Sequence, residues 1–403
     1  MKDASREVAR ASSATKDAAL LGGADLLLAR AAEILEANRA DLARAEESGV
    51  SPTVVDRLRL DARKLEGMAG GLQQVAGLPD PVGEVIDGWV RPSGIRIERV
   101  RGPLGVVGII YENRPNVTSD AAGLCLKAGN GAFLRGSSAA IESNTVIAAV
   151  LRDAYAKAGL PEDALVLVED TSREAAGEFM RLTGIIDVLI PRGGQSLVES
   201  ILEHATVPYV IDGDGNCHIY VDQSADLEMA RAIVVNAKCQ RPSVCNAAES
   251  LVVHADVAEA FLPAVAGDLA GVELVGDERT RELVPSAGPA TEDDYATEFL
   301  DLKLSVRVVP SLDEAIAHVN RFGSGHSEAI VTRSLEAADR FTREVDAGAV
   351  LVNASTRWVD GEEFGFGAEI GISTQKLHAR GPLGLQQLTT AKYVVRGEGQ
   401  IRT

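Results

Sequence analysis

The sequence predicts an α/β protein built on doubly wound parallel sheets, and three observations support this. First, apolar runs typical of buried parallel strands alternate with helical segments; they cover residues 106–110, 132–135, 165–168 and 188–190. Second, 46% of the residues are hydrophobic and 25% are charged, as in a globular protein. Third, a chain of 403 residues can build two or three packed units.

Helices are expected ahead of the first strand. Over residues 3–48 apolar side chains such as Leu27 and Ile34 recur at helical spacing, and Gly49 follows as a stop signal. Another helix is expected to begin at Ser51-Pro52-Thr53, because proline is favoured in the first helical turn.

Residues 85–101 predict a β-hairpin, because alternating segments flank the turn Pro92-Ser93-Gly94. The tail at residues 388–395 is expected to be one more strand. Together these segments are predicted to form a small β flap. Its unpaired strand edges could be covered by a second subunit, so we expect a homodimer or a dimer of dimers.

The remaining elements follow the same rhythm. Helices are expected over 118–127 and 141–157 in the first α/β unit. A second unit is expected to begin near residue 226, with a helix from 226 to 237. Its other expected elements are strands at 251–254, 306–309 and 349–353, helices after Val257 and after the capping box at Ser311, and a loop over 361–371.

The bulk properties exclude several classes of function. A formal net charge of −19 argues against non-specific binding of nucleic acids and of anionic membranes. No segment reaches the length of a membrane span, and the polar N-terminus lacks an apolar signal core, so a cytoplasmic protein is expected. Four cysteines are too few for a disulfide framework and lack zinc-site spacing, so no metal is expected.

Cys245 is the candidate nucleophile. It lies on a polar, proline-containing turn with Arg241 nearby, just ahead of the strand-like run Ser250-Leu251-Val252-Val253. A neighbouring cation favours the thiolate, which is the reactive form of cysteine. The alternative is a small buried residue, which is common for a cysteine that forms no disulfide.

The other cysteines are weaker candidates. Cys239 has a similar setting and is a rival for Cys245. Cys125 lies on an apolar helix face and is interpreted as structural. A dyad of Cys217 and His218 is not expected, because adjacent residues of a strand point to opposite faces. His326 and His378 lie in polar, glycine-containing stretches and are interpreted as surface residues.

Two segments that join strands to helices are candidates for binding a nucleotide. Arg135-Gly136-Ser137 follows a strand, where Arg135 could bind a ribose 2′-phosphate or be an ordinary surface arginine. Arg192-Gly193-Gly194 precedes a helix, whose N-terminus favours anions. Asn116 could donate its amide to a developing oxyanion, or could simply cap a helix.

Several long motifs, in order along nearly the whole chain, resemble the γ-glutamyl phosphate reductases, also called glutamate-5-semialdehyde dehydrogenases, of the aldehyde dehydrogenase superfamily. The motifs are Val106 to Asn116 with Gly129-Asn130, Gln240-Arg241-Pro242-Ser243-Val244-Cys245-Asn246, Asn353-Ala354-Ser355-Thr356-Arg357, and the segment Ser373 to Pro382. The resemblance implies reduction of L-glutamyl 5-phosphate by NADPH to L-glutamate 5-semialdehyde, with release of phosphate. This is the second step of proline biosynthesis.

The resemblance also implies roles for residues. Cys245 would attack the acyl phosphate and form a thioester, Asn116 would stabilise the oxyanion, and Glu298 would bind the nicotinamide ribose. Arg135 would meet the adenosine ribose, with Gly136, Ser137 and the 192–194 segment also near the cofactor. The candidates for holding the anionic substrate are Arg114, Arg241, Ser243, Ser355 and Arg357.

One departure from the superfamily is informative. Hydrolytic aldehyde dehydrogenases carry a glutamate base upstream of the nucleophile, and the matching position here is Ile211. That base activates the water that hydrolyses the thioester, so its absence suits an enzyme whose acyl partner is phosphate. Asp212 is not expected to substitute, because a shift of one residue reverses the side-chain direction in a strand.

The predicted division of the chain is an NADP-binding domain at 1–84 and 102–225, a catalytic domain at 226–372, and an oligomerisation flap at 85–101 and 373–403. Two alternatives remain open: a CoA-acylating or ordinary aldehyde dehydrogenase, and an inactive subunit in a complex with glutamate kinase. A transient contact with glutamate kinase is also conceivable for the active enzyme.

Overall fold

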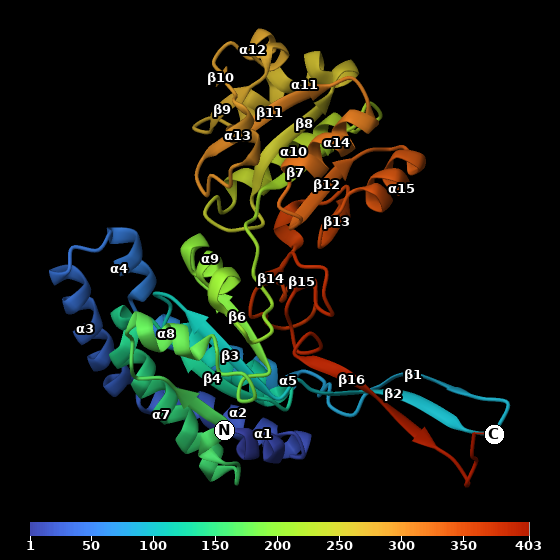
Figure 1. The fold of residues 1–403 in the computed structure, drawn as a ribbon. Helices are drawn as coiled ribbons and strands as arrows, with labels where there is room; N and C mark the ends of the chain where they lie inside the picture. The colour runs from blue at the N-terminus through green and yellow to red at the C-terminus, as the bar shows by residue number, and fades with distance from the viewer. Residues whose placement is uncertain (403) are drawn as a thin grey trace. The chain divides into compact units, whose positions relative to one another are not determined.

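The computed structural model describes residues 1–402, with the backbone alone at positions 52 and 53. The chain forms two compact units (Figure 1). The first contains Met1–Ile211, Gly365–Gly371 and the chain from residue 383 onward, and the second contains Asp212–Phe364 and Ile372–Pro382.

The N-terminal part of the first unit is helical, as predicted. Its helices are α1 (Lys2–Val8), α2 (Ser13–Ala29), α3 (Ala31–Glu47), α4 (Pro52–Leu58) and α5 (Ala62–Gly77). The side chains of Ser12, Ser51 and Asp61 cap three of them by accepting backbone N–H groups. Proline stands in the first turn of α4, where its missing N–H costs no hydrogen bond.

A parallel four-stranded sheet forms the centre of the first unit, in the order β5-β4-β3-β6. The strands are β3 (Val106–Tyr111), β4 (Gly131–Arg135), β5 (Leu165–Leu167) and β6 (Val188–Arg192). The helices that connect or follow them are α6 (Asn116–Lys127), α7 (Ile141–Lys157), α8 (Arg173–Phe179) and α9 (Gln195–His204). Phe179, Leu197 and Ile201 of α8 and α9 pack with Val106 and Ile110 of β3.

A separate antiparallel sheet joins distant parts of the first unit. It contains β1 (Val85–Val90), β2 (Arg96–Pro103) and β16 (Thr389–Arg396), with β2 in the middle. The predicted hairpin is therefore present, and the predicted C-terminal strand pairs with it from Thr389↔Pro103 to Arg396↔Arg96. The Asn130 side chain donates to the Leu388 carbonyl at 2.8 Å and so holds the chain just before β16 begins.

The second unit is a doubly wound sheet of seven parallel strands, in the order β10-β9-β11-β8-β7-β12-β13. The strands are β7 (Cys217–Val221), β8 (Ala248–His254), β9 (Glu273–Gly276), β10 (Gly288–Pro289), β11 (Lys303–Val309), β12 (Ser327–Val331) and β13 (Ala349–Val352). The α/β class and parallel sheets predicted from the sequence are confirmed.

Helices cover both faces of this sheet, so each face has its own apolar core. One core contains Val234 and Phe261 from α10 (Leu227–Cys239) and α11 (Ala255–Asp268). The other contains Ile316 and Phe341 from α14 (Leu312–Phe322) and α15 (Leu335–Glu344). Shorter elements are α12 (Glu278–Leu283), α13 (Glu292–Ala296), the 3-10 turn η3 (Thr356–Trp358), and the paired strands β14 (Ile372–Ser373) and β15 (Gly381–Pro382).

The division into units and the start of one helix differ from the sequence-based expectations. The first compact unit ends at Ile211 and not at residue 225, because Asp212 already bridges to Ser373 and leads into β7. Residues 372–382 belong to the second unit, and the chain after them returns to the first. Helix α6 begins at Asn116, two residues earlier than predicted, which places Asn116 inside the helix.

Candidate active site

The predicted site residues lie at one edge of each sheet. In the first unit, Arg135 is the last residue of β4, and Asn116 and Gly193 follow the carboxyl ends of β3 and β6. In the second unit, Cys245 and Glu298 precede β8 and β11, at the amino ends of those strands. Because neighbouring strands are parallel, the segments that enter β7, β8 and β11 meet at the same edge. The candidate nucleophile is therefore at the edge opposite to the one where parallel sheets usually bind ligands.

Cys245 is partly exposed on a turn whose neighbours are anchored to η3 and the residue after it. The Asn246 carbonyl accepts a hydrogen bond from the Thr356 hydroxyl at 2.7 Å. The Asn246 amide donates to the Val359 carbonyl at 2.9 Å. Thr356 and Val359 are themselves fully buried, so the residue after the nucleophile is fixed on two sides.

Arg241 and Arg357 share the electrostatic environment of Cys245. Arg357 donates from Nε to the Gln240 side chain at 2.8 Å. Burial lowers the pKa of Arg357, and Arg241 lowers it further, whereas Asp360 and Cys245 act in the opposite direction. Two predicted substrate-binding arginines are thus neighbours of the candidate nucleophile.

A pocket of about 650 Å³ lies beside this region in the second unit. Its lining includes Gln240, Ser355, Arg357, Trp358 and Asp360. Ser355 is buried and its hydroxyl caps η3 by accepting the Arg357 N–H at 3.3 Å. The pocket thus contains two of the predicted substrate-binding residues, and the caps and anchors of η3 give it a defined wall. Ser243 is exposed on the turn of Cys245.

Glu298 belongs to the same edge. Its Oε1 accepts the backbone N–H of Gly215 at 2.8 Å. Burial raises the pKa of Glu298, and the Gly215 hydrogen bond opposes that shift. A Cβ atom at position 215 would overlap the Cys245 carbonyl, so Gly215 touches the nucleophile's backbone while it holds Glu298. The sequence analysis did not single out Gly215.

Arg135 has a structural partner as well as an unused donor. Its guanidinium donates to the carbonyls of Thr171 and Ser172 at 2.7 and 3.0 Å, while its buried Nε has no hydrogen-bond partner. Burial lowers the pKa of Arg135. The adjacent Ser137 hydroxyl pairs with the Asn113 side chain at 3.3 Å. Gly136 is required because a side chain there would overlap the Asn144 amide.

The predicted anion site at the start of α9 is occupied by a carboxylate. Gly194 caps α9, and its N–H donates to Glu112 Oε2 at 3.1 Å. A side chain at Gly193 would meet the same carboxylate group. A helix N-terminus stabilises negative charge, and here the Glu112 carboxylate supplies that charge. An anion that binds Arg192-Gly193-Gly194 must therefore replace Glu112.

Asn116 is not a helix cap. Pro115 occupies the capping position of α6, and no side chain caps that helix. The Asn116 amide instead donates to Asp120 Oδ2 at 2.9 Å, one turn along the helix. Burial raises the pKa of Asp120 to about 6, opposed by the Asn116 hydrogen bond and by Arg192. The capping interpretation is therefore wrong, and Asp120 is a partner of Asn116 that the sequence analysis did not single out. Arg114, also in this segment, is exposed.

The cysteines and histidines are partly as predicted. Cys125 is fully buried and Cys239 is exposed. Cys217 and His218 have separate partners, since Cys217 Sγ lies 3.7 Å from His326 Nδ1 and His218 Nδ1 lies 3.1 Å from Glu328 Oε2. His378 is exposed as predicted, but His326 is fully buried, so its assignment to the surface was wrong.

Position 211 is occupied by a buried isoleucine. The neighbouring Asp212 carboxylate accepts the Ile372 backbone N–H at 2.8 Å. This hydrogen bond gives Asp212 a structural role within the second unit.

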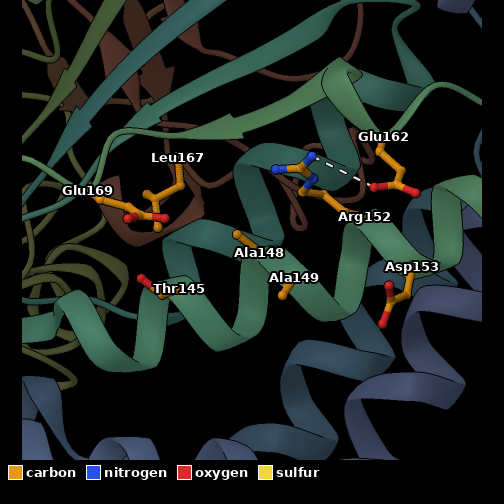
Figure 2. Close-up of a pocket in the computed structure, with 8 residues that line it drawn as sticks. All are labelled: Thr145, Ala148, Ala149, Arg152, Asp153, Glu162, Leu167 and Glu169. Atoms are coloured by element: carbon orange, nitrogen blue, oxygen red, sulfur yellow. Dashed lines mark ion pairs between the residues drawn. The ribbon is translucent and has the colours of Figure 1, made fainter.

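A second hollow, of about 260 Å³, lies between α7 and β5 in the first unit (Figure 2). Arg152 is the basic residue of its lining, and Figure 2 shows its guanidinium directed toward Glu162, to which it pairs at 3.7 Å. Arg152 also pairs with Asp163 at 3.3 Å. Because carboxylates already compensate this cation, the hollow lacks the positive charge that an anionic substrate requires.

Within residues 1–402, none of the helices is both long and apolar enough to cross a membrane. Across the same residues, no group of three or more His, Cys, Asp or Glu side chains is arranged to hold a metal ion.

Comparison with known proteins identifies the family. The model of the aldehyde dehydrogenase family matches residues 2–301 and 304–394. A gamma-glutamyl phosphate reductase from Carboxydothermus hydrogenoformans is 57% identical over 403 residues, covering all of this chain and 97% of the relative. One from Caldanaerobacter subterraneus subsp. tengcongensis is 54% identical with the same coverage. The crystal structure of the Thermotoga maritima gamma-glutamyl phosphate reductase matches with a TM-score of 0.98 at 49% identity, covering 100% of this chain and 98% of that one. The chain therefore belongs to the aldehyde dehydrogenase family and, within it, to the gamma-glutamyl phosphate reductases, which are oxidoreductases.

Proposed function

We propose that this enzyme reduces L-glutamyl 5-phosphate with NADPH to L-glutamate 5-semialdehyde and phosphate, the second step of proline biosynthesis, through a thioester on Cys245. The observation that carries the proposal is the nucleophile turn. Cys245 is partly exposed on a turn fixed by buried hydrogen bonds, with Arg241 and Arg357 as electrostatic neighbours. Full-length identity to relatives that bear the reductase name supports the choice of substrate.

In this proposal the Cys245 thiolate forms a bond to the C5 carbonyl of the substrate. The carbonyl oxygen becomes an oxyanion, which the Asn116 amide stabilises, and the C–O bond to phosphate then breaks to leave the thioester. NADPH, when bound, supplies the hydride that reduces the thioester carbonyl. The resulting thiohemiacetal loses its C–S bond, which releases the aldehyde and regenerates the thiolate of Cys245.

The residues fit a phosphorylated dinucleotide. The buried Arg135 Nε lacks a hydrogen-bond partner, so this guanidinium retains a donor for a ribose phosphate. Glu298 uses Oε1 for Gly215, which leaves Oε2 as an acceptor for a ribose hydroxyl. The first unit, with Arg135, Gly136, Ser137 and the 192–194 segment, would hold the cofactor, and the second unit would carry the nucleophile.

The thioester must survive until hydride reaches it. A general base beside the nucleophile would activate water and hydrolyse the thioester. Ile211 cannot act as a base, and the Asp212 carboxylate is engaged with the backbone of Ile372. Phosphate in the reverse reaction is thus the proposed acyl acceptor.

The substrate carries a phosphate and an α-carboxylate, so its recognition requires cations. Arg357 and Ser355 line the 650 Å³ pocket, and Arg241 and Ser243 lie on the nucleophile turn. We assign these residues, together with Arg114, to substrate binding because arginine pairs with carboxylate and phosphate through two N–H groups at once.

The proposal also covers the localisation, the oligomeric state and a partner of the enzyme. A cytoplasmic homodimer or dimer of dimers is expected, with the β1-β2-β16 sheet as the contact. A transient contact with glutamate kinase would transfer the labile acyl phosphate from the enzyme that makes it.

The direct test is reduction of NADP by glutamate 5-semialdehyde in the presence of phosphate. Cys245→Ala should lower kcat at least about a thousandfold, because the nucleophile is lost. Cys239→Ala, the matched change at the exposed rival thiol, should leave kcat within about twofold of wild type.

Acyl acceptors distinguish the remaining alternatives. Phosphate should support the reaction far better than water, and replacement of phosphate by coenzyme A should abolish it. A water-supported rate equal to the phosphate-supported rate would contradict the inference from Ile211. A rate that requires coenzyme A would assign the chain to the CoA-acylating class, and a fully active Cys245→Ala protein would refute the mechanism.

A further inference from the structure

Cys217 is a buried thiol that the proposed chemistry does not use. It is the first residue of β7 and has no exposed surface. Its Sγ lies 3.2 Å from the backbone carbonyl oxygen of Cys245, 28 positions later in the chain. This contact joins the amino end of β7 directly to the peptide of the candidate nucleophile.

The direction of this hydrogen bond is fixed by chemistry. A carbonyl oxygen can only accept, so the Cys217 thiol must donate its one proton. Desolvation raises the pKa of Cys217 well above its usual range, so the group stays protonated as the donor role requires. The other neighbour of the thiol, His326 Nδ1, is farther away at 3.7 Å and has the Ser327 hydroxyl at 2.7 Å.

Close packing supports the same contact. Gly215 approaches Cys245 so closely that a Cβ atom at position 215 would overlap the carbonyl group of Cys245. The Cys217 N–H also donates to the Gly215 carbonyl at 2.8 Å, which turns the chain sharply ahead of β7. The backbone that enters β7 therefore lies against the Cys245 peptide. This close approach brings the Cys217 thiol within hydrogen-bond distance of the Cys245 carbonyl.

The carbonyls on either side of Cys245 are held independently. The Val244 carbonyl accepts the Ala247 N–H at 3.0 Å, within the turn itself. The Asn246 carbonyl accepts the buried Thr356 hydroxyl at 2.7 Å. Three successive peptides of the turn are thus fixed by three different donors, and Cys217 supplies the one at the nucleophile.

We propose that Cys217 is a positioning residue for Cys245, whose thiol holds the Cys245 peptide and so fixes the direction in which the nucleophile's side chain points. This inference rests on the proposed role of Cys245 as nucleophile. Rotation of one peptide displaces the attached side chain, and a displacement of about 1 Å at a reacting atom can cost roughly a hundredfold in rate. Cys217 itself touches no reacting atom in this assignment.

The test compares two substitutions at position 217 in the full-length protein. Cys217→Ala removes the donor, and we expect kcat for the phosphate-dependent oxidation of glutamate 5-semialdehyde to fall about three- to tenfold, with KM for NADP unchanged. Cys217→Ser keeps an O–H donor and should recover most of the lost kcat. A role in bulk packing predicts no such rescue.

Cys125→Ala is the matched control, because Cys125 is an equally buried thiol in the first unit. Cys125→Ala should lower Tm as Cys217→Ala does, but it should leave kcat within about twofold of the wild-type value. The proposal is overturned if Cys217→Ala has wild-type kcat, or if Cys217→Ser is as slow as Cys217→Ala.

A second measurement covers the case in which Cys217→Ala fails to fold. Thr356→Val removes the neighbouring donor with little change of volume. The double variant Cys217→Ser/Thr356→Val should lose more kcat than the product of the two single losses, because both donors hold the same turn. Additive single effects would contradict a shared positioning role. Failure of the proposed function would be recognised separately, by an active Cys245→Ala protein.

Discussion

Asn116 shows, for one side chain, what a sequence pattern does and does not specify. Its local sequence left two roles open, a helix cap and an oxyanion donor, and only the family resemblance favoured the second. The structure pairs the amide with Asp120 at the i+4 position, where two helical side chains face each other. That spacing was visible in the sequence, but the burial that perturbs Asp120 was not.

The Asp120 carboxyl should make stability depend on pH. Its pKa is raised from 3.8 to about 6, so between these values the native state holds a proton that the unfolded chain has lost. The stability contributed by this group is complete below pH 3.8 and is lost as pH rises through 6. We expect this loss to be at most about 3 kcal/mol, because a pKa change of one unit corresponds to about 1.4 kcal/mol.

Asp120→Asn is uncharged at every pH and should remove this loss. Urea unfolding of both proteins between pH 4 and 7 measures the difference directly. Asp3→Asn, at a side chain that is 90% exposed, is the control and should follow the wild-type profile. Parallel curves for wild type and Asp120→Asn would show that Asp120 ionises equally in both states.

Secondary elements were predictable where an apolar run was continuous. β3 and β8 are buried along their whole length, and both were expected from their apolar residues. β12 was missed because its sequence, Ser-Glu-Ala-Ile-Val, carries Glu328 inside the strand. That carboxylate is stabilised by the His218 N–H at 2.7 Å and by the His218 ring, a tertiary pairing that no local pattern reveals.

The site was predictable to the same extent. Motifs alone proposed Cys245, Glu298 and Arg357 as site residues. By contrast, Gly215, Cys217 and Thr356 contact this region only because separate strands and turns meet at one edge of the sheet. Their identities follow from close approach of backbones, which depends on tertiary packing. Sequence spacing alone could not place a residue of β7 next to a turn 28 positions away.

A buried ion pair joins two elements of the second unit. Lys238 of α10 and Glu249 of β8 have no exposed side-chain surface and lie 2.6 Å apart. Burial raises the pKa of Glu249 to about 7, and Lys238 opposes that shift. Glu249 also accepts the Leu300 N–H at 3.2 Å. Leu300 has a positive φ of 54° and lies two residues after Glu298, so this hydrogen bond holds the loop that carries Glu298.

Lys238→Met should therefore have two effects. It leaves a buried carboxylate without its cation, and we expect a loss of roughly 3 kcal/mol in the free energy of unfolding. It should also raise KM for NADPH, because Glu249 without its cation no longer has a fixed position from which to accept the Leu300 N–H of the loop that carries Glu298. Adding Glu249→Gln should restore part of the stability, because a neutral amide needs no counter-charge.

Arg231→Met on the same helix is the control. Its ion pair with Asp268 is solvent-accessible, so Arg231→Met should destabilise the protein far less than Lys238→Met and leave KM for NADPH unchanged. Urea unfolding and steady-state kinetics on the four proteins measure both effects. An unchanged KM for NADPH in Lys238→Met would separate the ion pair from the cofactor site.

For the molecule as a whole, the β1-β2-β16 sheet is one region where several large apolar side chains are exposed together. Trp89, Val90, Tyr393 and Val395 are between 44% and 64% exposed on this sheet. The Trp89 and Tyr393 rings contact each other edge to face, with centroids 6.3 Å apart. Aromatic residues of this kind are enriched in protein interfaces, and β1 and β16 each present an unpaired strand edge.

Assembly through this sheet must act against charge. Each chain carries a formal net charge of −19, so two copies repel each other at low ionic strength. Salt screens that repulsion over about 10 Å at 0.1 M, whereas burial of apolar area is not weakened by it. We therefore expect the dimer to become tighter as ionic strength rises from 0.01 to about 0.15 M.

Tyr393→Asp should convert the dimer into a monomer, because it replaces an exposed aromatic contact with a further negative charge. Leu335→Asp is the matched control, since Leu335 is a 77% exposed apolar residue on α15 of the other unit and should leave the dimer intact. Light scattering coupled to size exclusion, at two salt concentrations, measures the mass of each protein.

Two results would contradict a dimer contact on this sheet. The wild-type protein could elute as a monomer, or Leu335→Asp could dissociate the dimer as Tyr393→Asp does. If apolar side chains hold two negatively charged copies together, Tyr393→Asp alone should dissociate the dimer. Added salt should restore part of the dimer, because it screens the repulsion between the copies.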